Sequence, residues 1–341
     1  MYSVLSTTCT ILLFLTVFLP NANSQLTSWT YESNVASAKL GAKLARCDVN
    51  ADSYLDLVVT GTTSVYVFHG NASGTFPATP TATRLIVSSP AVTTEGMGVE
   101  CADLNADGFA DVIVGNWTGS PSYIHIFNGS ASGIAASPNT VTWSGTGHYF
   151  GYAIAAADYN GDGKMDLAVG AYGLGRVVIY YGLGSAGINP VASTQSALYP
   201  NVLTYGMVVV PCDLSNDGTP DLIVTARNMN SSMGQAFVYR NVGGTFQLAH
   251  NTIGAVASAF YGYDASCGDI NGDGNKDVAI LSQGDRLLYI YYGTGNVSTL
   301  PKPASLVIPL IDAARSINVA DFNLDGYADV IVGCNGLGSV R

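Results

Sequence analysis

Six short segments carry the residues of this chain that are best suited to chemistry. In Asp158-Tyr159-Asn160-Gly161-Asp162-Gly163-Lys164-Met165-Asp166, side-chain oxygens recur at the first, third, fifth and ninth positions. Carboxylates interleaved with small residues let a short loop wrap one hard divalent cation, which takes roughly six to eight oxygen ligands. We therefore predict up to six Ca2+ ions, bound by Asp48, Asn50, Asp52 and Asp56; Asp103, Asn105, Asp107 and Asp111; Asp158, Asn160, Asp162 and Asp166; Asp213, Ser215, Asp217 and Asp221; Asp269, Asn271, Asp273 and Asp277; and Asp321, Asn323, Asp325 and Asp329.

The six copies are not identical. The sixth position is glycine in five of them, which suits a sharp reversal with positive φ, whereas the first copy has Ser53 and looks weakest. Ser215 replaces the third-position asparagine of the fourth copy, so that loop exchanges an amide ligand for a shorter hydroxyl.

The alternative interpretation is that Asp, Asn and Gly merely form turns. The distribution of charge argues against it, because 18 of the 24 acidic residues lie at the first, fifth and ninth positions of the loops. Gathering like charges in this way costs free energy unless a cation offsets it. Six divalent ions would also outweigh the formal net charge of −11.

The surroundings of the loops predict the fold class. An EF-hand would need a glutamate at the twelfth position and flanking helices, but here a β-branched run such as Val112-Ile113-Val114 follows at once. The first aspartates recur every 52 to 56 residues, and each period holds four short apolar segments, the third of them aromatic, as in Val177-Val178-Ile179-Tyr180. Because such a period is the size of a propeller blade and helical periodicity is absent, we predict an all-β propeller of four-stranded antiparallel blades.

Composition and the N-terminus indicate an extracellular protein. A pI near 4.5 with 13 Lys and Arg argues against nucleic-acid binding. Residues 11–19 are apolar and a small-residue stretch follows, so we predict a signal peptide over 1–24, with cleavage after Ser24. The run is too short to span a membrane. Five glycosylation sequons, at Asn71, Asn116, Asn128, Asn230 and Asn296, favour a secreted glycoprotein.

Cysteine positions predict two cross-links. Cys47 and Cys101 precede the first and second loops by one and two residues, and Cys212 and Cys267 repeat that relation before the fourth and fifth. We predict Cys47–Cys101 and Cys212–Cys267 disulfides between equivalent strands of neighbouring repeats, with buried free thiols as the alternative. Cys334 has no predicted partner.

Motifs around the loops resemble a known family. Phe150-Gly151 lies eight residues before Asp158, Val169-Gly170-Ala171 follows that loop, and Tyr205-Gly206 and Tyr261-Gly262 hold the same offset as Phe150-Gly151. This pattern resembles the FG-GAP repeat of integrin α-subunit N-terminal propellers. The resemblance covers residues 25–341 and implies a β-propeller whose calcium loops join the first two strands of each blade.

Some positions depart from the family pattern. Ala313-Ala314 and Glu95-Gly96 stand where the aromatic-glycine pair is expected, and Leu40-Gly41 is a fainter version of it. All six repeats carry a loop, and no leg domain or membrane span follows. Arg341 falls where a third strand should begin, which predicts a chain truncated at its C-terminus with six blades, or seven in a longer chain. The segment 26–31 resembles a fourth strand.

Three functions remain open from the sequence. We expect a secreted or cell-surface, calcium-binding module that recognises a protein or glycan, as in cell adhesion, and Trp117, Tyr172 and Tyr199 are candidate contacts. The alternatives are a lectin with repeated sugar sites, or the non-catalytic propeller of a larger extracellular enzyme or receptor. Catalysis is not expected, because none of the four histidines belongs to a recognisable catalytic motif.

Overall fold

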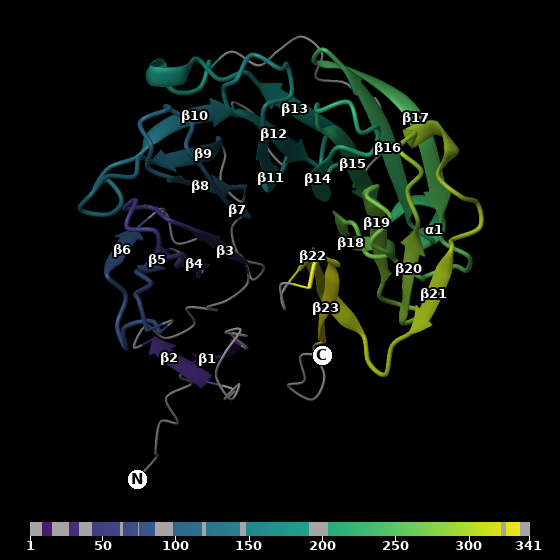
Figure 1. Ribbon diagram of the computed structural model, residues 1–341, viewed down its shortest axis with the longest axis horizontal. Helices are drawn as coiled ribbons and strands as arrows, with labels where there is room; N and C mark the ends of the chain where they lie inside the picture. Colours follow the sequence, from purple (N-terminus) through teal and green to yellow (C-terminus); the bar gives the residue numbers. More distant parts are fainter. Residues whose placement is uncertain are drawn as a thin grey trace. The chain divides into compact units, whose positions relative to one another are not determined.

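The structure, a computed structural model shown in Figure 1, consists almost entirely of β-strands and turns. It describes residues 9–15, 27–33, 43–61, 64–73, 75–85, 98–117, 121–143, 148–190, 204–321 and 325–334. Within these ranges the helical elements are one four-residue α-helix and two single 3-10 turns: α1 (Met229–Ser232), η1 (Gly184–Ala186) and η2 (Val297–Thr299). The predicted all-β class is therefore confirmed.

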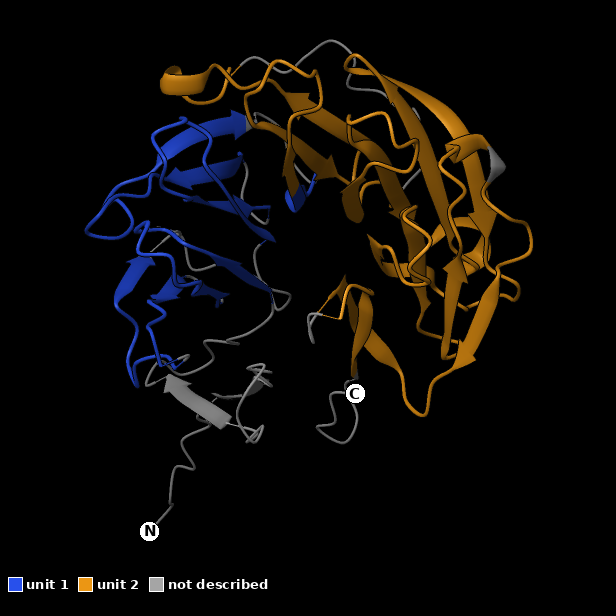
Figure 2. Ribbon diagram, viewed as in Figure 1, with its two compact units in different colours: residues 1–154 blue, residues 155–341 orange. Residues whose placement is uncertain are grey.

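The chain divides into two compact units, Met1–Ile154 and Ala155–Arg341 (Figure 2). Unit 1 contains two sheets of four antiparallel strands, and in each sheet neighbours in sequence are neighbours in space. The strands of these sheets are β3 (Leu44–Cys47), β4 (Asp56–Thr60), β5 (Ser64–Phe68) and β6 (Ala82–Leu85), then β7 (Gly98–Ala102), β8 (Asp111–Asn116), β9 (Ser122–Phe127) and β10 (Asn139–Trp143).

Unit 2 repeats the same meander in two further four-stranded sheets. Their strands are β14 (Val208–Cys212), β15 (Asp221–Ala226), β16 (Gln235–Val242) and β17 (Thr245–Ile253), then β18 (Tyr261–Gly268), β19 (Asp277–Ser282), β20 (Leu287–Tyr291) and β21 (Leu306–Pro309). A three-stranded sheet crosses the boundary between the units, and a two-stranded one lies near the C-terminus: β11 (Phe150–Ala157), β12 (Asp166–Ala171) and β13 (Arg176–Tyr180), then β22 (Ala314–Ala320) and β23 (Asp329–Cys334).

The N-terminal part of the chain contributes β1 (Cys9–Leu15) and β2 (Thr27–Ser33), which pair antiparallel. The segment predicted to resemble a strand thus falls largely within β2. Ser24, the predicted cleavage point, and the dipeptides Leu40-Gly41 and Glu95-Gly96 lie outside the described residues, as does the side chain of Cys334. The signal peptide stays a prediction.

The second strand of each full sheet is covered on both faces. In β8, β15 and β19 all six residues are buried, and in β4 all five are. Strands buried on both faces need continuous apolar runs rather than alternation, which is why the sequence after each loop is rich in Val, Ile and Leu.

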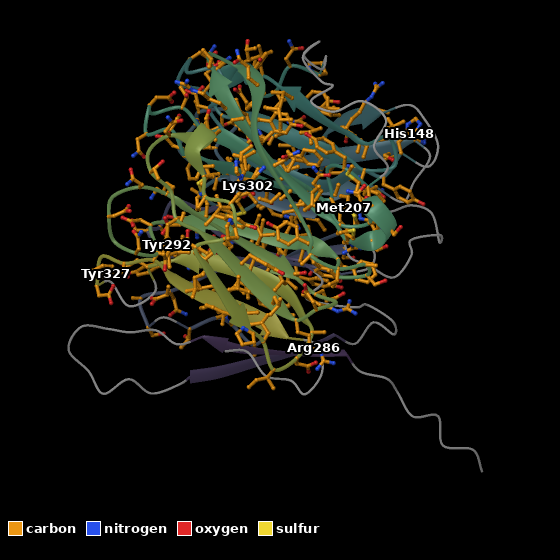
Figure 3. All side chains as sticks on the ribbon, turned by 90° about the vertical axis from the view of Figure 1, so that its right-hand side faces the viewer. His148, Met207, Arg286, Tyr292, Lys302 and Tyr327 are labelled. Carbon is orange, nitrogen blue, oxygen red and sulfur yellow. A yellow bond between two sulfur atoms is a disulfide. The ribbon has the colours of Figure 1, made fainter. Side chains whose placement is uncertain are left out.

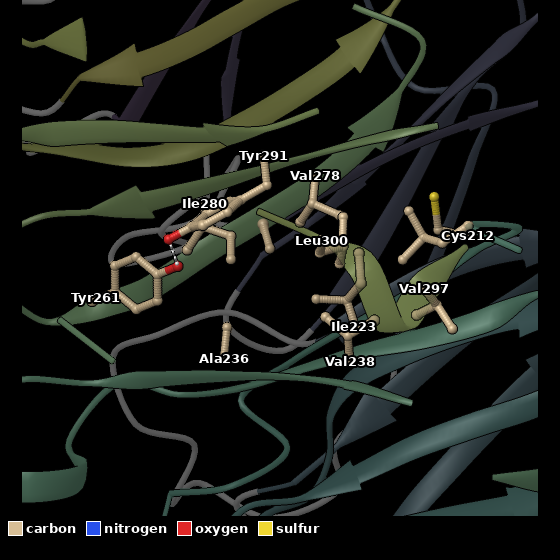
Figure 4. Close-up of a cluster of buried hydrophobic side chains, with 12 residues drawn as sticks. Cys212, Ile223, Ala236, Val238, Tyr261, Val278, Ile280, Tyr291, Val297 and Leu300 are labelled. Carbon is tan, nitrogen blue, oxygen red and sulfur yellow. Dashed lines mark hydrogen bonds between the residues drawn. The ribbon is translucent and has the colours of Figure 1, made fainter. Parts of the chain in front are cut away.

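Buried apolar clusters hold neighbouring sheets together within each unit. In unit 1 one cluster joins Val58 and Val67 to Val112, Val114 and Phe127. In unit 2 another joins β15 and β16 to β19 and β20, and there the Tyr261 and Tyr291 hydroxyls are 2.7 Å apart (Figure 4). Each large side chain buried in this way contributes on the order of 1.5–3 kcal/mol of transfer free energy.

The aromatic-glycine pairs join one sheet to the preceding one. Phe150 is fully buried, and Gly151 has φ 91° with its backbone against Gly115 and Ile124 of the preceding sheet. A Cβ on Gly115 would overlap the Gly151 carbonyl. Tyr205-Gly206 packs in the same manner against Gly170 in unit 2. Glycine is therefore required on both sides of this contact.

Both predicted disulfides are present. Cys47 of β3 is bonded to Cys101 of β7 with Cα atoms 6.0 Å apart, and Cys212 of β14 is bonded to Cys267 of β18 with Cα atoms 6.4 Å apart. Each bond joins the first strands of successive sheets within one unit, as the repeated offset from the loops predicts.

Candidate metal centres

Each repeated loop connects the first strand of a sheet to the second. Loops 1 and 2 follow β3 and β7 in unit 1, and loops 3 to 6 follow β11, β14, β18 and β22. This confirms the strand-loop-strand prediction. Asn323 of loop 6 lies outside the described residues. Below, the first, third and fifth residues of a loop are called its head, and the ninth-position aspartate its tail.

Loop 3 shows how the head is built. Asp158 Oδ1 accepts hydrogen bonds from the N–H groups of Gly161 at 2.7 Å and Asp162 at 3.1 Å, and its Oδ2 accepts one from Gly163 at 2.7 Å. Asn160 Oδ1 accepts a further bond from Asp162 N–H at 2.9 Å. Backbone donors therefore curl the loop around its own side-chain oxygens.

The same arrangement occurs in all six loops. The fifth- and sixth-position N–H groups donate to the first-position carboxylate at 3.0–3.1 Å and 2.7–3.0 Å, respectively; the accepting residues are Asp48, Asp103, Asp158, Asp213, Asp269 and Asp321. The sequence therefore specifies the same pair of backbone hydrogen bonds to the first-position carboxylate six times.

The sixth position confirms the predicted need for positive φ. Its five glycines have φ between 79° and 92°, and Ser53 adopts the same region with φ 70°. A non-glycine residue there is under strain, so loop 1 reaches the common conformation at a conformational cost.

Five of the six tails are buried, unlike the heads, and Asp329 of loop 6 is half-buried. Asp166 is fully buried; its Oδ2 accepts a hydrogen bond from Tyr159 N–H at 2.9 Å and its Oδ1 accepts one from Gly182 N–H at 2.7 Å. Four other tails are buried with equivalent partners, one at the second loop position and one at the end of the third strand or just beyond it: Asp56, Asp111, Asp221 and Asp277. A tail thus joins its loop to the third strand of its own sheet.

The residue that donates to the tail from the end of the third strand, or from just beyond it, was not identified from the sequence. It is glycine in four sheets, where a Cβ would collide with the eighth-position carbonyl of the loop: Gly70, Gly129, Gly182 and Gly293. In the fourth sheet it is Asn241, which is fully buried. A glycine 14 to 18 residues after four of the tails is the sequence signal that could have revealed it.

Head and tail carboxylates interact electrostatically. Burial raises the pKa of Asp166 to about 6, two backbone N–H groups oppose that shift, and the charges of Asp158 and Asp162 reinforce it. Burial also raises the pKa of the other buried tails, to about 6 for Asp111: Asp56, Asp111, Asp221 and Asp277. A divalent cation held by the loop would offset this repulsion.

The donor set of a loop suits a hard cation. Among the described residues, no group of three or more His, Cys, Asp or Glu side chains is arranged to hold a metal ion. A head offers two carboxylates and one amide or hydroxyl oxygen, and the tail oxygens are already hydrogen-bonded. Because a carboxylate oxygen can accept two interactions, the tail retains capacity for a cation. Oxygen donors of these types are those that calcium prefers, and the predicted ligand set stays a prediction.

The loops differ in what lies beside the fifth-position carboxylate. In loop 3, Lys164 Nζ lies 3.3 Å from Asp162 Oδ2. In loop 4, Arg240 Nη2 lies 3.9 Å from Asp217 Oδ2, and Thr219 also donates to Asp217. Loop 4 therefore combines the Ser215 replacement with a competing cation.

The structure revises one of the predicted partner contacts. Trp117 is 6% exposed and packs edge-on against Tyr152 and at a tilt against Tyr149, so it is a core residue. Tyr172 is half-buried in the turn after β12, and Tyr199 lies outside the described residues. The sequence could not separate these cases, because aromatic residues are common in both cores and interfaces.

Comparison with known proteins identifies the repeat. The profile of the FG-GAP-like repeat matches five overlapping segments: 48–114, 103–169, 158–224, 213–280 and 269–332. Mouse integrin alpha-8 is 28% identical over 218 residues, which are 56% of this chain and 20% of that protein. Rat phosphatidylinositol-glycan-specific phospholipase D is 30% identical over 164 residues, which are 42% of this chain and 20% of that protein. The chain thus spans about a fifth of the length of these relatives.

A solved structure shares the fold. It is that of an Agrocybe aegerita lectin described as recognising non-reducing terminal N-acetylglucosamine, with a TM-score of 0.59 and 19% identity, over 89% of this chain and 80% of the lectin. Together with the repeat match and the four-stranded antiparallel sheets, this similarity confirms the predicted β-propeller class. Among the described residues, no helix is long and apolar enough to cross a membrane.

Proposed function

Since this chain belongs to the family of proteins with FG-GAP-like repeats, we propose that it is a calcium-binding β-propeller that acts outside the cell as a binding module for a protein or glycan. The observation that carries the proposal is the head geometry, which recurs in all six loops with the same backbone donors. Binding modules of this kind present variable loops from a rigid scaffold.

The residues of each loop have separate tasks in this proposal. The head supplies oxygens of its first, third and fifth residues to one cation, and the tail fixes the loop to the third strand of its sheet. Bound calcium supplies the positive charge that offsets the repulsion among these carboxylates. Because the unfolded chain lacks the site, cation affinity becomes stability of the folded state.

Calcium binding is tested by thermal unfolding of the secreted chain in excess calcium and in chelator, together with native mass spectrometry to count the ions. We expect a higher unfolding midpoint with calcium and up to six bound ions. Equal midpoints without bound ions would mean that the loops are only turns.

The extracellular assignment rests on the disulfides and the sequons. Disulfides persist in oxidising compartments, and both bonds here lie within the repeat array. The sequons Asn71 and Asn296 occupy exposed turns in which the asparagine Oδ1 accepts from the N–H of the serine two residues on. Asn116 is 6% exposed at the end of β8.

Peptide mapping of the secreted chain after enzymatic deglycosylation tests this assignment. We expect glycans at Asn71 and Asn296 and an unmodified Asn116, which serves as the internal control. A chain without any glycan would contradict the assignment, whereas a glycan at Asn116 would contradict the burial of that side chain.

A lectin is the second candidate function. The structural neighbour that recognises N-acetylglucosamine has the same fold, and repeated sites in such a fold would raise avidity. A glycan array with terminal N-acetylglucosamine among its probes, read with calcium and with chelator, tests this candidate. Specific binding to one sugar class favours a lectin, whereas binding only to an immobilised extracellular protein favours an adhesion-type module.

The module itself is non-catalytic in this proposal, and a larger extracellular enzyme or receptor is an alternative setting for it. The matched segments are about a fifth of the integrin and phospholipase D relatives. An assay of the isolated chain on a phosphatidylinositol-glycan substrate tests the point, and turnover above that of a chain lacking the head aspartates would contradict it.

A further inference from the structure

Neighbouring loops within each unit are joined by hydrogen bonds. In unit 1 the Ala110 N–H, at the eighth position of loop 2, donates to the Asp48 carbonyl of loop 1 at 3.2 Å. In unit 2 the equivalent Ala328 N–H of loop 6 donates to the Asp269 carbonyl of loop 5 at 2.8 Å. In both cases the residue next to one tail is tied to the first residue of the preceding loop.

Loop 4 cannot form this bond, because its eighth residue is Pro220, which has no N–H. The buried Asn241 side chain replaces it: its Nδ2 donates to the Tyr159 carbonyl of loop 3 at 2.7 Å and to the Pro220 carbonyl at 3.0 Å. The Asn241 N–H also donates to the loop 4 tail, Asp221, at 2.8 Å. Loops 3 and 4 are thus joined through a residue that also holds a tail.

Loops 4 and 5 are joined by their side chains. Asn216 Nδ2, at the fourth position of loop 4, donates to Asn275 Oδ1, at the seventh position of loop 5, at 2.7 Å. Loop 6 repeats the same spatial relation with loop 5, because the exposed ring of Tyr327 (Figure 3), at its seventh position, lies against Gly272, at the fourth position of loop 5. A contact between the fourth residue of one loop and the seventh residue of the next therefore occurs twice in unit 2.

We propose that neighbouring loops within a unit bind divalent cations cooperatively through these links. They join the first, second or fourth residue of one loop to the seventh or eighth residue of the next loop, directly or through Asn241. This inference rests on the calcium binding proposed above. A cation that orders one head also fixes the backbone to which the next loop is attached. The next loop then has less conformational entropy to lose when its own cation binds, so that cation binds more tightly. Asn216, Asn241 and Asn275 are the positioning residues that transmit the effect, and none of the three is a predicted ligand.

The test is a calcium titration of the full chain against a chromophoric chelator, comparing wild type with Asn216→Gly. Glycine removes the link to Asn275 without strain, because loops 3 and 5 carry Gly161 and Gly272 at the same position with φ 74°. Wild type should give a Hill coefficient above one. The variant should give a lower coefficient and about two- to tenfold weaker binding at the two loops concerned, the range that one hydrogen bond supplies.

Two further variants make the comparison decisive. Asn275→Thr breaks the same link from the side of loop 5, and threonine is the residue that loop 4 carries at the equivalent position. This variant tests the coupling if Asn216→Gly does not fold. Asn228→Gly is the control, because Asn228 is exposed and its side chain makes no capping bond. It should bind calcium as wild type does.

The outcomes separate this inference from the proposed function. Bound ions with a Hill coefficient of one, unchanged in both link variants, would overturn the coupling and leave calcium binding intact. Absence of bound ions in wild type would overturn the proposed function and the coupling together. A loss of cooperativity in the control as large as in the link variants would also count against the coupling.

Discussion

The head and the tail of a loop contain the same residue type in opposite environments. Asp162 in the head is exposed and accepts hydrogen bonds within its own loop. Asp166 in the tail is fully buried and accepts hydrogen bonds from Tyr159 N–H in the loop and from Gly182 N–H after the third strand. A buried carboxylate is tolerated only when polar partners satisfy it. The repeated aspartates therefore divide into a set that is available to a cation and a set that builds the blade.

This difference implies that stability depends on the two sets under different conditions. Removing a tail leaves buried N–H groups unsatisfied whether or not a cation is bound. Removing the exposed fifth-position residue of a head should cost stability mainly when a cation is bound. Substitutions within a single loop can separate these effects.

The largest effect is expected from Asp166→Ala. Without the carboxylate, Tyr159 N–H and Gly182 N–H lose their acceptors, and we expect the free energy of unfolding to fall by about 2–6 kcal/mol in chelator and by at least as much in calcium. Urea unfolding followed by circular dichroism measures the change. Asp166→Asn keeps one acceptor oxygen and should cost less. Wild-type stability of Asp166→Ala in chelator would disprove the structural role of the tail.

A half-buried carboxylate outside the loops offers a reference for the tails. Glu100 on β7 accepts one hydrogen bond, from Cys101 N–H at 2.9 Å, and burial raises its pKa from 4.5 to about 7. Because folding favours the protonated form, stability should fall as pH rises from about 4.5 to about 7, by up to about 3 kcal/mol. The Glu100→Gln variant should lack this component of the pH dependence, as measured by unfolding at several pH values in chelator. Equal slopes in both proteins would exclude it.

The head substitution Asp162→Ala should act only through the cation. At a calcium concentration about a hundredfold above the dissociation constant, losing one site costs about 2–3 kcal/mol. In chelator we expect little change, because Asp162 is exposed and its pair with Lys164 at 3.3 Å is also exposed. Thermal unfolding under both conditions measures the difference. A loss in chelator as large as that of Asp166→Ala would remove the distinction between head and tail.

The smallest effect is expected from Ser215→Asn in loop 4. The substitution restores the amide oxygen that the other described heads carry, and we expect about two- to tenfold tighter calcium binding at that loop. Arg240→Ala should act in the same direction, because it removes the cation beside Asp217. Terbium luminescence titration of each variant against wild type provides the measurement. Weaker binding in Ser215→Asn would show that the hydroxyl is the better ligand there.

The sequence alone specified much of the fold. Alternating loops and apolar runs placed the strands because both are local patterns, and the fixed offset of Cys47 and Cys101 from their loops predicted a bond between strands one repeat apart. The positive φ of the sixth position followed from glycine chemistry.

The sequence did not reveal the separate role of the tails or the links between loops. Asp162 and Asp166 have the same side chain, and only tertiary packing buries one of them. Asn241 resembles any turn residue in sequence, yet it replaces a backbone donor that Pro220 lacks 21 positions earlier. The replacement of a backbone donor by a distant side chain depends on tertiary contacts, which no local sequence pattern encodes.

The two disulfides also determine how the chain responds to mechanical tension. A pull on the chain ends is carried across each sulfur-sulfur bond, so the segments that they enclose, 54 and 55 residues in sequence separation, stay out of the extended length. At about 3.3–3.6 Å per residue, each bond withholds about 180–195 Å of contour length. A single stretched molecule should therefore lengthen in two discrete additional steps once a reductant is added. Each step should add the contour length that one disulfide encloses, which is about one repeat.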